Sequence, residues 1–338
     1  MKTRDFSFDL PPELIAQEPA RIRGTSRMLV LDRASGRSSD SGVGDLPRWI
    51  DPGSVVVVND TRVRKARLFA ESPGGKTVEF LLLAQREPRL WEALASRAKP
   101  LEIGERYRFP GGITGTAEPT GEETRLVRFD APVDDGWLER YGHVPLPPYI
   151  RRTDTPADEE RYQTVYSRVM GSAAAPTAGL HLTPRILGEI EARGARTAAV
   201  TLHVGLGTFL PIRSEDIEDH RMHEEFYTIP AETKASVDAA VREGRPVLAV
   251  GTTVVRALES AWTGDGLREG DGRTRVFIAP GFTFRVVRQL FTNFHTPGSS
   301  LLVLVSAFAG RELILRAYAD AVARRYRFFS YGDAMLIR

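Results

Sequence analysis

The run of four valines from Val55 to Val58 constrains the fold more than any other stretch of the sequence. Successive side chains of a strand point to opposite faces of its sheet, so an unbroken apolar run predicts a strand buried on both faces. Such strands occur in parallel or mixed sheets with helices packed over both sides. The polar residues 59–62, Asn-Asp-Thr-Arg, follow the run. Because open α/β sheets bind ligands beyond the carboxyl ends of their strands, these residues predict a site at that edge.

Strands and helices alternate through much of the remaining chain, which predicts an α/β domain. The clearest helix covers residues 184–194, with Thr183 as its N-cap, Pro184 at its first position and Gly194 at its end. Further strands are predicted at residues 28–32, 198–202, 247–250 and 275–278, and further helices at residues 231–243, 254–262 and 311–327. The apolar run 301–308 fits a strand or a buried helix.

From about residue 66 the sequence changes to short β-type runs separated by turns rich in glycine and proline. This spacing predicts a small all-β barrel or sandwich. The proline-rich residues 142–152 would then form a semi-rigid connector back to the α/β domain. We therefore predict an α/β main domain with a mixed sheet, made of residues 1–65 and 151–338, and an inserted small all-β barrel at residues 66–150.

The composition is that of an ordinary globular protein, and it excludes several kinds of chemistry. The 338 residues include no cysteine, which excludes disulfide frameworks, thiolate zinc sites and cysteine nucleophiles. The formal net charge is only +2, so a nucleic acid would have to bind at local basic patches. The first ten residues lack an apolar core, and no apolar run approaches membrane-spanning length. These features predict a cytoplasmic protein without a membrane partner.

The stretch 172–183, SAAAPTAGLHLT, has the composition of a binding-site wall. Its small residues let a backbone approach a ligand closely, and Pro176 stiffens the turn. Two more polar or glycine-rich loops follow predicted strands, at residues 203–208 and 251–253. With the loop at 59–62, they favour one shared site over isolated turns. None of them is a standard dinucleotide, P-loop or methyltransferase signature.

The six histidines are the main candidates for proton transfer or metal binding. His181, His203 and His295 lie in loops of small residues and threonine, whereas a histidine is more often a surface or satisfied core residue. His143 lies in the connector. The pair in residues 220–223, HRMH, would share one face of a helix and could ligate a metal. Because no HExxH motif exists and the flanks are acidic, a solvated turn explains this pair equally well.

Two basic clusters are candidates for RNA contact. Residues 62–67 hold four cations just where the β insert begins. Residues 324–327 hold three arginines, close to aromatic residues that would stack on unpaired bases. Charge clusters are usually solvated faces, so the residues alone favour neither interpretation.

Long strings along nearly the whole chain are specific enough to identify a family. They include DFSFDLPPELIAQEP, VVVVNDTRV, GHVPLPPYI, PTAGLH, TLHVGLGTF, HRMHEE, GTTVVRALES, TNFH and YRFFSYGDAMLI. These strings resemble the S-adenosylmethionine:tRNA ribosyltransferase-isomerase family of the queuosine pathway. The resemblance also implies an α/β domain with an inserted β-barrel. Thr296 and Gly298 stand where relatives carry leucine and lysine, so a contact by that lysine is not expected here.

The resemblance implies transfer of the ribosyl portion of S-adenosylmethionine to 7-aminomethyl-7-deazaguanine at the wobble position of tRNA. Isomerisation would give epoxyqueuosine-tRNA, with release of adenine and methionine. A base must remove the C5′ proton, which the sulfonium acidifies, and an acid must protonate the departing adenine. S-adenosylmethionine is a co-substrate here, and neither a metal nor a redox cofactor is implied. The expected partners are tRNA and S-adenosylmethionine, and the expected state is a monomer.

The resemblance and the loop positions together imply roles for individual residues. The catalytic candidates are His181, His203 and Glu225, and we expect both histidines to face the bound nucleoside in one cleft. The substrate-binding candidates are Asp60, Arg62, His143, Thr177, Gly179, Thr208, Phe209, Thr252, Thr253, Asn293 and His295. Of these, Phe209 and the threonines at 208, 252 and 253 would hold adenine and ribose, and Asp60 and Arg62 would hold the methionine part. The RNA-binding candidates are Arg64, Lys65 and Arg67.

Two other functions are compatible with parts of the sequence. One is a metal-dependent hydrolase that uses His203, His220 and His223. The other is a non-enzymatic RNA-binding protein that uses the β insert and the basic segments. Several loops rich in histidine, threonine and glycine argue against the second alternative, because a simple binding module does not need them.

Overall fold

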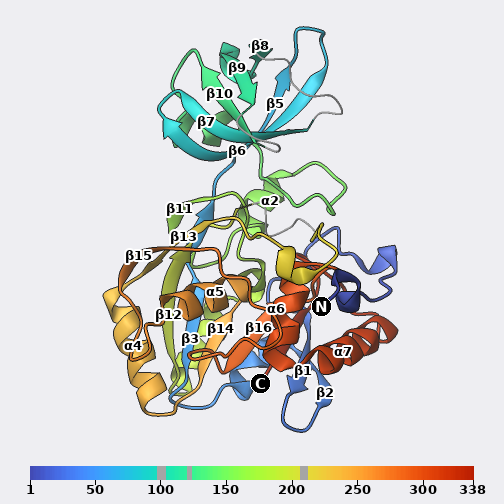
Figure 1. Cartoon of the computed structure of the whole chain (residues 1–338), viewed down its shortest axis with the longest axis vertical. Coiled ribbons are helices and arrows are strands. Elements are labelled where there is room, and N and C mark those ends of the chain that lie inside the picture. The colour runs from blue at the N-terminus through green and yellow to red at the C-terminus, as the bar shows by residue number, and fades with distance from the viewer. Residues whose placement is uncertain (97–103, 120–123, 206–211) are drawn as a thin grey trace.

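The computed structural model describes residues 1–96, 104–119, 124–205 and 212–338. It has a large α/β body and a small β-barrel that stands at one end of this body (Figure 1). The barrel stands at the end toward which β3 (Val55–Asn59) runs, since the chain continues from β3 through β4 (Thr61–Val63) into the barrel. This end of the body is therefore the one where a ligand site is expected.

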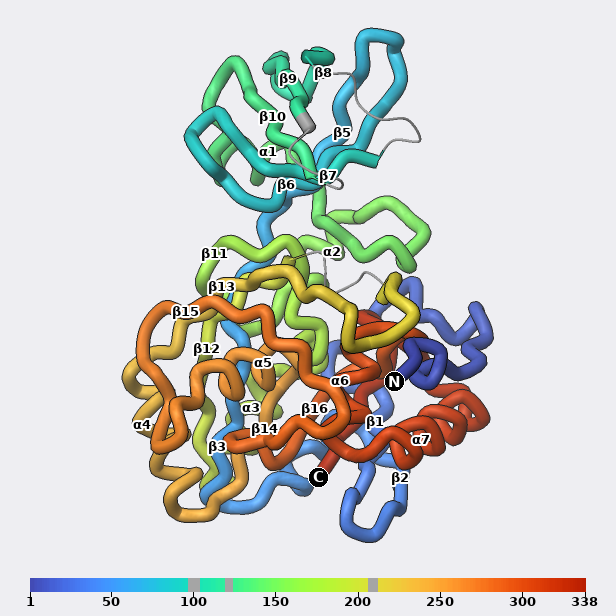
Figure 2. The backbone as a smooth tube through the Cα atoms, viewed as in Figure 1, coloured from blue at the N-terminus to red at the C-terminus, as the bar shows by residue number. Residues whose placement is uncertain are grey.

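The body is built on a nine-stranded mixed sheet. Its strands, in spatial order, are β15 (Gly270–Thr274), β13 (Glu225–Ile229), β12 (Arg196–Leu202), β3, β14 (Val247–Val250), β16 (Gln289–Asn293), β17 (Ala334–Ile337), β1 (Arg27–Asp32) and β2 (Arg37–Gly42). β12, β3, β14 and β16 are neighbours and run parallel, so their carboxyl ends meet at one edge. β1 and β17 lie side by side although they come from opposite ends of the chain (Figure 2).

The valine run forms the buried centre of this sheet, as the sequence predicts. Val55 and Val57 belong to one hydrophobic core, and Val56 and Val58 belong to a second core on the opposite face. The first core includes side chains from α4 (Ala231–Arg242), α5 (Thr252–Ala261), α6 (Ser300–Ala309) and α7 (Arg311–Ala323). The second core includes α3 (Pro184–Ala192) and the 3-10 helix η3 (Val43–Trp49). Helices on both faces make this an α/β domain.

The cap of α3 is the one expected from the sequence. The hydroxyl of Thr183 accepts a hydrogen bond from the amide of Ile186 at 3.2 Å, and Pro184 occupies the first turn. Gly194 follows the helix with a φ of +86°, which favours glycine. The apolar run 301–308 is helical, within α6.

The insert is a closed barrel with its own core. Its strands, in spatial order, are β10 (Arg125–Phe129), β7 (Leu90–Ser96), β6 (Thr77–Glu87), β5 (Arg67–Glu71), β8 (Glu105–Arg108) and β9 (Thr114–Pro119). Its buried side chains extend from Ala66 to Leu138, the latter in α1 (Asp135–Tyr141). The barrel fold is thus confirmed, whereas the exact domain boundaries at residues 66 and 150 stay a prediction.

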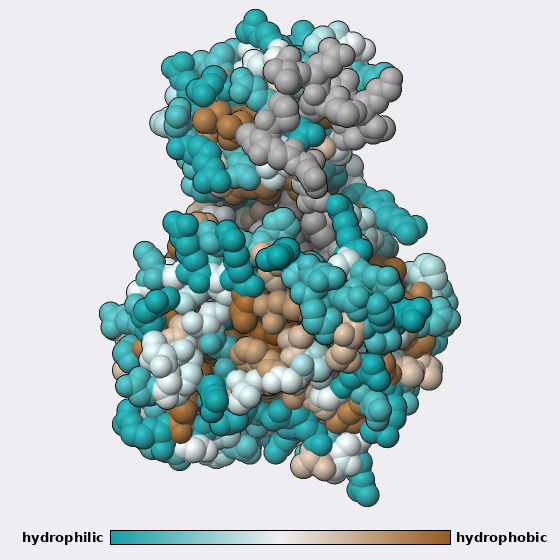
Figure 3. Space-filling view, viewed as in Figure 1, coloured by the Kyte–Doolittle hydropathy of each residue, from teal (hydrophilic) through white to brown (hydrophobic). Residues whose placement is uncertain are grey.

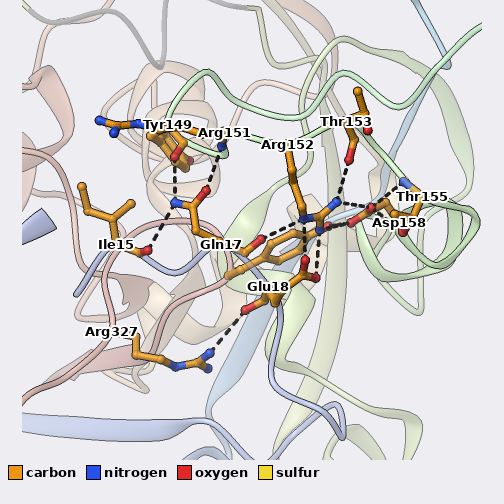
Figure 4. Close-up of polar contacts among 11 residues, drawn as sticks. Ile15, Gln17, Glu18, Tyr149, Arg151, Arg152, Thr153, Thr155, Asp158 and Arg327 are labelled. Carbon is orange, nitrogen blue, oxygen red and sulfur yellow. Dashed lines mark hydrogen bonds and ion pairs between the residues drawn. The ribbon is translucent and has the colours of Figure 1, made fainter. Parts of the chain in front are cut away.

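The connector after the barrel is fastened to the rest of the body by polar contacts (Figure 4). Gln17 donates to the carbonyl of Tyr149 at 2.9 Å and accepts from the amide of Arg151 at 2.8 Å. Arg152 pairs with Asp158 of α2 (Pro156–Arg161) through two hydrogen bonds of 2.7 and 2.9 Å. The connector is therefore anchored to the N-terminal segment and to α2.

One predicted strand is wrong, and several strands were not predicted. Residues 275–278 are not a strand, because β15 ends at Thr274, whose hydroxyl accepts the amide hydrogen of Val276. The missed strands include β9, β13, β16 and β17. These strands are short, and each either begins or ends in a polar residue or lies at the end of the chain.

Hydrophilic residues cover much of the face in Figure 3, with apolar residues gathered near the middle of the body.

Candidate functional site

A pocket lies where the parallel strands end, at the edge that the sequence predicts. One part of its lining comes from η5 (Thr177–His181) and the loop before it, and from the loops that follow β12 and β14. The other part comes from β16 and the loop after it, and from α5 and α6. They are Ala175, Pro176, Thr177, Ala178, Val204, Gly251, Thr252, Thr253, Thr292, Asn293, His295 and Leu301. Its empty volume, including its mouth, is ≈ 380 Å³. We call this cavity the edge pocket. It brings together five predicted substrate-binding residues, namely Thr177, Thr252, Thr253, Asn293 and His295.

Asn293 presents an unused acceptor in the edge pocket. Its side-chain Nδ2 donates to Nε2 of His181 at 2.9 Å and to the carbonyl of Phe329 at 3.1 Å. A carbonyl oxygen only accepts, so this contact fixes the orientation of the amide. Its Oδ1 is buried and has no hydrogen-bond partner among the described residues. Buried polar atoms are nearly always paired, so this oxygen is a candidate contact for a bound ligand.

His181 supports Asn293 from behind and does not line the edge pocket. Because Nε2 accepts from Asn293, the ring must carry its proton on Nδ1 and be neutral. Burial is the main reason that the pKa of His181 falls to about 3, and the positive charges of Arg327 and Arg23 lower it further. His181 lines a second pocket. Neither this pocket nor the edge pocket is lined by both His181 and His203, so their meeting in one cleft stays a prediction.

The N-terminus of α5 faces the edge pocket through Gly251, Thr252 and Thr253. Gly251 has a φ of +92°, a conformation that favours glycine. The first amides of a helix lack intrahelical acceptors and carry partial positive charge, so they suit an anionic ligand group. His295 lies nearby, with its Nε2 bonded to the hydroxyl of Thr292 at 3.0 Å, and burial lowers its pKa to about 3.

His203 lies at the end of β12, next to the pocket residue Val204. Its Nδ1 shares a 2.8 Å hydrogen bond with the hydroxyl of Thr61. A Cβ at Gly171 would come within 2.7 Å of the imidazole, so only glycine leaves room for this ring position. Burial, and secondarily Arg64, lowers the pKa of His203, while Asp60 raises it. The ring is thus held in one place and is biased toward its neutral form.

Asp60 and Arg62 lie outside the lining of the edge pocket. The carboxylate of Asp60 accepts from Arg168 at 2.9 Å and from the hydroxyl of Thr201 at 2.6 Å. This buried carboxylate therefore already has partners, which sequence reasoning did not reveal. Arg62 lines a different pocket, between the barrel and the body.

Glu225, at the start of β13, forms a buried ion pair with Arg256 of α5. The Nε and Nη2 atoms of Arg256 are buried and have no hydrogen-bond partner among the described residues. Sequence reasoning missed Arg256, although it lies one turn after Thr252 and so on the same side of α5. It also missed Thr292 and Leu301 of the edge pocket, although Thr292 belongs to the TNFH string.

Four substrate-binding candidates remain, and the structure describes two of them. Gly179 packs against Tyr166, whose hydroxyl would be 2.1 Å from an added Cβ, so packing accounts for this glycine. His143 lies at the base of the barrel, bonded to Asp154 at 3.0 Å. Thr208 and Phe209 lie outside the described residues.

The predicted RNA-binding cations all form ion pairs. Arg64 pairs with Asp135 at 2.6 Å, Lys65 with Glu139 and Glu159, and Arg67 with Glu79 at 2.9 Å. Their side chains are only 15–18% exposed. These residues connect the barrel to the body or lie within the barrel wall, and the structure does not test whether they also contact RNA.

The proposed metal pair has no support in the described geometry. Residues 220–223 are not helical, so the two histidines do not share a helix face. His220 packs edge-on against Phe277. Within the part of the chain that the structure describes, no group of three or more histidine, aspartate or glutamate side chains could hold a metal ion.

The structure is that of an α/β protein with an accessory β-barrel and a pocket at the carboxyl edge of its sheet, an arrangement typical of enzymes. Comparison with known proteins identifies the family. The family described as "Queuosine biosynthesis protein" matches residues 3–337. The chain belongs to this family. It is therefore an enzyme of the transferase class.

Relatives cover the whole chain. An S-adenosylmethionine:tRNA ribosyltransferase-isomerase of Rubrobacter xylanophilus is 52% identical, over 100% of this chain and 98% of that protein. The protein of the same name from Treponema denticola is 48% identical over the full length of both. The crystal structure of an S-adenosylmethionine tRNA ribosyltransferase from Thermotoga maritima is similar, with a TM-score of 0.58, 34% identity, and coverage of 99% and 100%. Among the described residues, no helix is long and apolar enough to cross a membrane.

Proposed function

We propose that this enzyme transfers and isomerises the ribosyl group of S-adenosylmethionine onto 7-aminomethyl-7-deazaguanine at the wobble position of tRNA. The products are epoxyqueuosine-tRNA, adenine and methionine. The observation that carries this proposal is the edge pocket, because the family's most specific strings, PTAGLH, GTTVVRALES and TNFH, meet there. The enzyme name borne by the full-length relatives agrees with this reaction.

S-adenosylmethionine is the ligand that we assign to the edge pocket. The free amides at the start of α5 suit a carboxylate or a ribose oxygen, and the threonines at 252 and 253 add hydroxyls. Oδ1 of Asn293 would accept a hydrogen bond from an amino or hydroxyl group of the nucleoside. No metal ion is needed for this recognition, and the protein's own groups supply both charge and hydrogen bonds.

Proton transfer is the remaining requirement. We assign the role of general base to His203, because its neutral form is favoured and its position beside Val204 is fixed by Thr61 and Gly171. His181 then positions Asn293 and does not touch the substrate. Glu225 is the third catalytic candidate. We assign it a positioning role, because its ion pair fixes the side chain of Arg256 on α5. His295 lines the pocket, but burial lowers its pKa to about 3, so its ring is neutral and we do not assign it as the acid that protonates adenine.

Incubation with S-adenosylmethionine labelled in both adenine and ribose, together with tRNA that carries the precursor base, tests this function. We expect free labelled adenine and ribosyl label in the tRNA. Label found only in S-adenosylhomocysteine would identify a methyltransferase instead. Exhaustive chelation should leave the rate unchanged, and loss of activity on chelation would favour the metal-dependent alternative.

A further inference from the structure

A second pocket is lined by His181 and by two arginines that form no ion pair with the described residues. Its lining residues are Pro19, Ala20, Arg23, Gly24, Ser26, Arg161, Leu180, His181, Ser330 and Tyr331, and its empty volume, including its mouth, is ≈ 280 Å³. We call it the arginine pocket. From its geometry we propose that the arginine pocket binds a phosphate of the RNA backbone. This inference rests on the proposed function, which supplies RNA as the substrate.

The two guanidinium groups are held in place by main-chain carbonyls alone. Arg23 donates to the carbonyls of Gln163, Leu180 and Glu160 at 2.9–3.1 Å. Arg161 donates to the carbonyl of Ala20 at 2.6 Å. Within the described residues, neither side chain has a carboxylate oxygen within ion-pair distance. Carbonyls orient a guanidinium but leave its full positive charge uncompensated.

Two carboxylates near this pocket, those of Asp158 and Glu18, pair with Arg152. Arg152 binds both oxygens of Asp158 and pairs with Glu18 at 2.7 Å (Figure 4). The hydroxyl of Tyr331, which lines the pocket, also donates to Asp158. Burial, and secondarily the charge of Arg161, lowers the pKa of Arg23, while Glu160, Tyr331 and Tyr166 partly offset this effect. An anion entering the pocket would therefore meet two pre-positioned cations.

A backbone phosphate of RNA fits this site better than a carboxylate or an isolated anion. Arginine binds phosphate oxygens through its planar fork of N–H donors, and RNA-binding proteins place many contacts on phosphates. Arg64, Lys65 and Arg67 already form ion pairs with carboxylates. Much of the positive charge that attracts RNA must therefore come from other residues. The net charge of +2 makes such a local site necessary.

The arginine pocket also lies in the right place. His181 lines it, and Nε2 of the same ring holds Asn293, which lines the edge pocket. The two pockets are thus separated by one histidine–asparagine pair. The linings of the two pockets are therefore directly joined by this hydrogen bond.

The test compares Arg23→Gln, Arg161→Gln and the double variant with wild type and with Arg242→Gln, an exposed control on α4. Affinity for tRNA that carries the precursor base is measured by fluorescence anisotropy over a series of salt concentrations. Loss of two phosphate contacts should weaken binding about tenfold or more at low salt and reduce the salt slope by about 1.5 to 2. S-adenosylmethionine affinity, measured by calorimetry, should stay within twofold of wild type, since neither arginine lines the edge pocket.

Unchanged RNA affinity and salt slope in the double variant would overturn the proposal. If Arg23→Gln does not fold, Arg161→Gln carries the test alone, with an expected reduction of the slope by about 1. The lysine variants Arg23→Lys and Arg161→Lys should keep the slope, because they keep the charge. If wild-type enzyme binds this tRNA and releases adenine while the glutamine variants match it, only the pocket assignment fails. Failure of wild type to bind the tRNA would overturn the proposed function as well.

Discussion

The side-chain amide of Asn293 donates to Nε2 of His181 at 2.9 Å, and this bond sets the orientation of both residues. The asparagine oxygen is buried and has no hydrogen-bond partner among the described residues, and the histidine proton is placed on Nδ1. Residues 112 positions apart in the chain thereby connect the two pockets.

Removing the oxygen of Asn293 should weaken S-adenosylmethionine binding. Asn293→Leu keeps the volume but loses the acceptor, so we expect the dissociation constant to rise about tenfold, the equivalent of one hydrogen bond of about 1.4 kcal/mol. Calorimetry on the folded variant measures this change. His181→Ala is the matched comparison, because Asn293 keeps its bond to Phe329, and it should raise the constant less. Equal affinity of Asn293→Leu and wild type would show that this oxygen does not contact the ligand.

His203→Ala should lower turnover by about a hundredfold, the usual scale for a lost proton-transfer group. S-adenosylmethionine affinity should change far less, because a group that acts in the transition state adds little to ground-state binding. Single-turnover adenine release and calorimetry measure the two quantities. His220→Ala, which removes a histidine packed on Phe277, serves as the control. Normal turnover with a lower melting temperature would make His203 a structural residue.

Gly171→Ala should reduce turnover although it removes no titratable group. The new Cβ would lie within 2.7 Å of the His203 ring, so the imidazole must move away from its bond with Thr61. We expect a loss of at least about tenfold, since small misplacements of catalytic groups are costly. Gly188→Ala is the control, because a Cβ there has nothing within 4 Å. Identical rates for both variants would contradict the role of Gly171 in placing the ring.

Two buried histidines should make the fold sensitive to acid. The pKa values of His181 and His295 are about 3 in the folded chain and about 6.5 when unfolded. The unfolded state therefore binds protons that the folded state excludes, so stability falls as the pH drops below 6.5 toward 3. Between pH 6.5 and 5 each histidine should remove about 2 kcal/mol from the free energy of unfolding. Urea unfolding at both pH values should show a smaller loss for His295→Gln than for wild type, and equal losses would refute this account.

The cluster Arg64, Lys65 and Arg67 should contribute less to RNA affinity per cation than the arginine pocket. Changing all three to alanine should still weaken tRNA binding and flatten its salt dependence, because the carboxylate partners are the more exposed members of these pairs and can be replaced by phosphates. The anisotropy series described for the pocket measures this effect on the same scale. Affinity and slope equal to those of wild type would make this cluster a structural link between barrel and body.

The sequence predicted what depends on local pattern. The valine run, the cap at Thr183 and the spacing of the β insert are local signals, and the structure confirms the elements they predict. β16 escaped prediction because it ends in polar residues, of which Asn293 bonds to His181, 112 positions away, a contact that no local window reveals.

The candidate site was predicted only in part, for the same reason. The loops that line the edge pocket were recognisable from their small and polar residues, since such loops follow buried strands. The partners of Asp60, Glu225 and Arg64 are 108, 31 and 71 positions away in the sequence. From the sequence alone, a charged side chain is easily taken to be free to bind a ligand. In the fold, an oppositely charged residue from a distant element can pair with it.

The base of the barrel is closed by a pair of main-chain hydrogen bonds. The amide of His143 donates to the carbonyl of Arg67 at 2.8 Å, and the amide of Arg67 donates to the carbonyl of His143 at 3.3 Å. The chain therefore enters and leaves the barrel at adjacent points, and the barrel's hydrophobic core is separate from the other three hydrophobic clusters. In evolutionary terms, a unit joined in this way can be inserted, removed or exchanged while the sheet that carries the edge pocket is preserved.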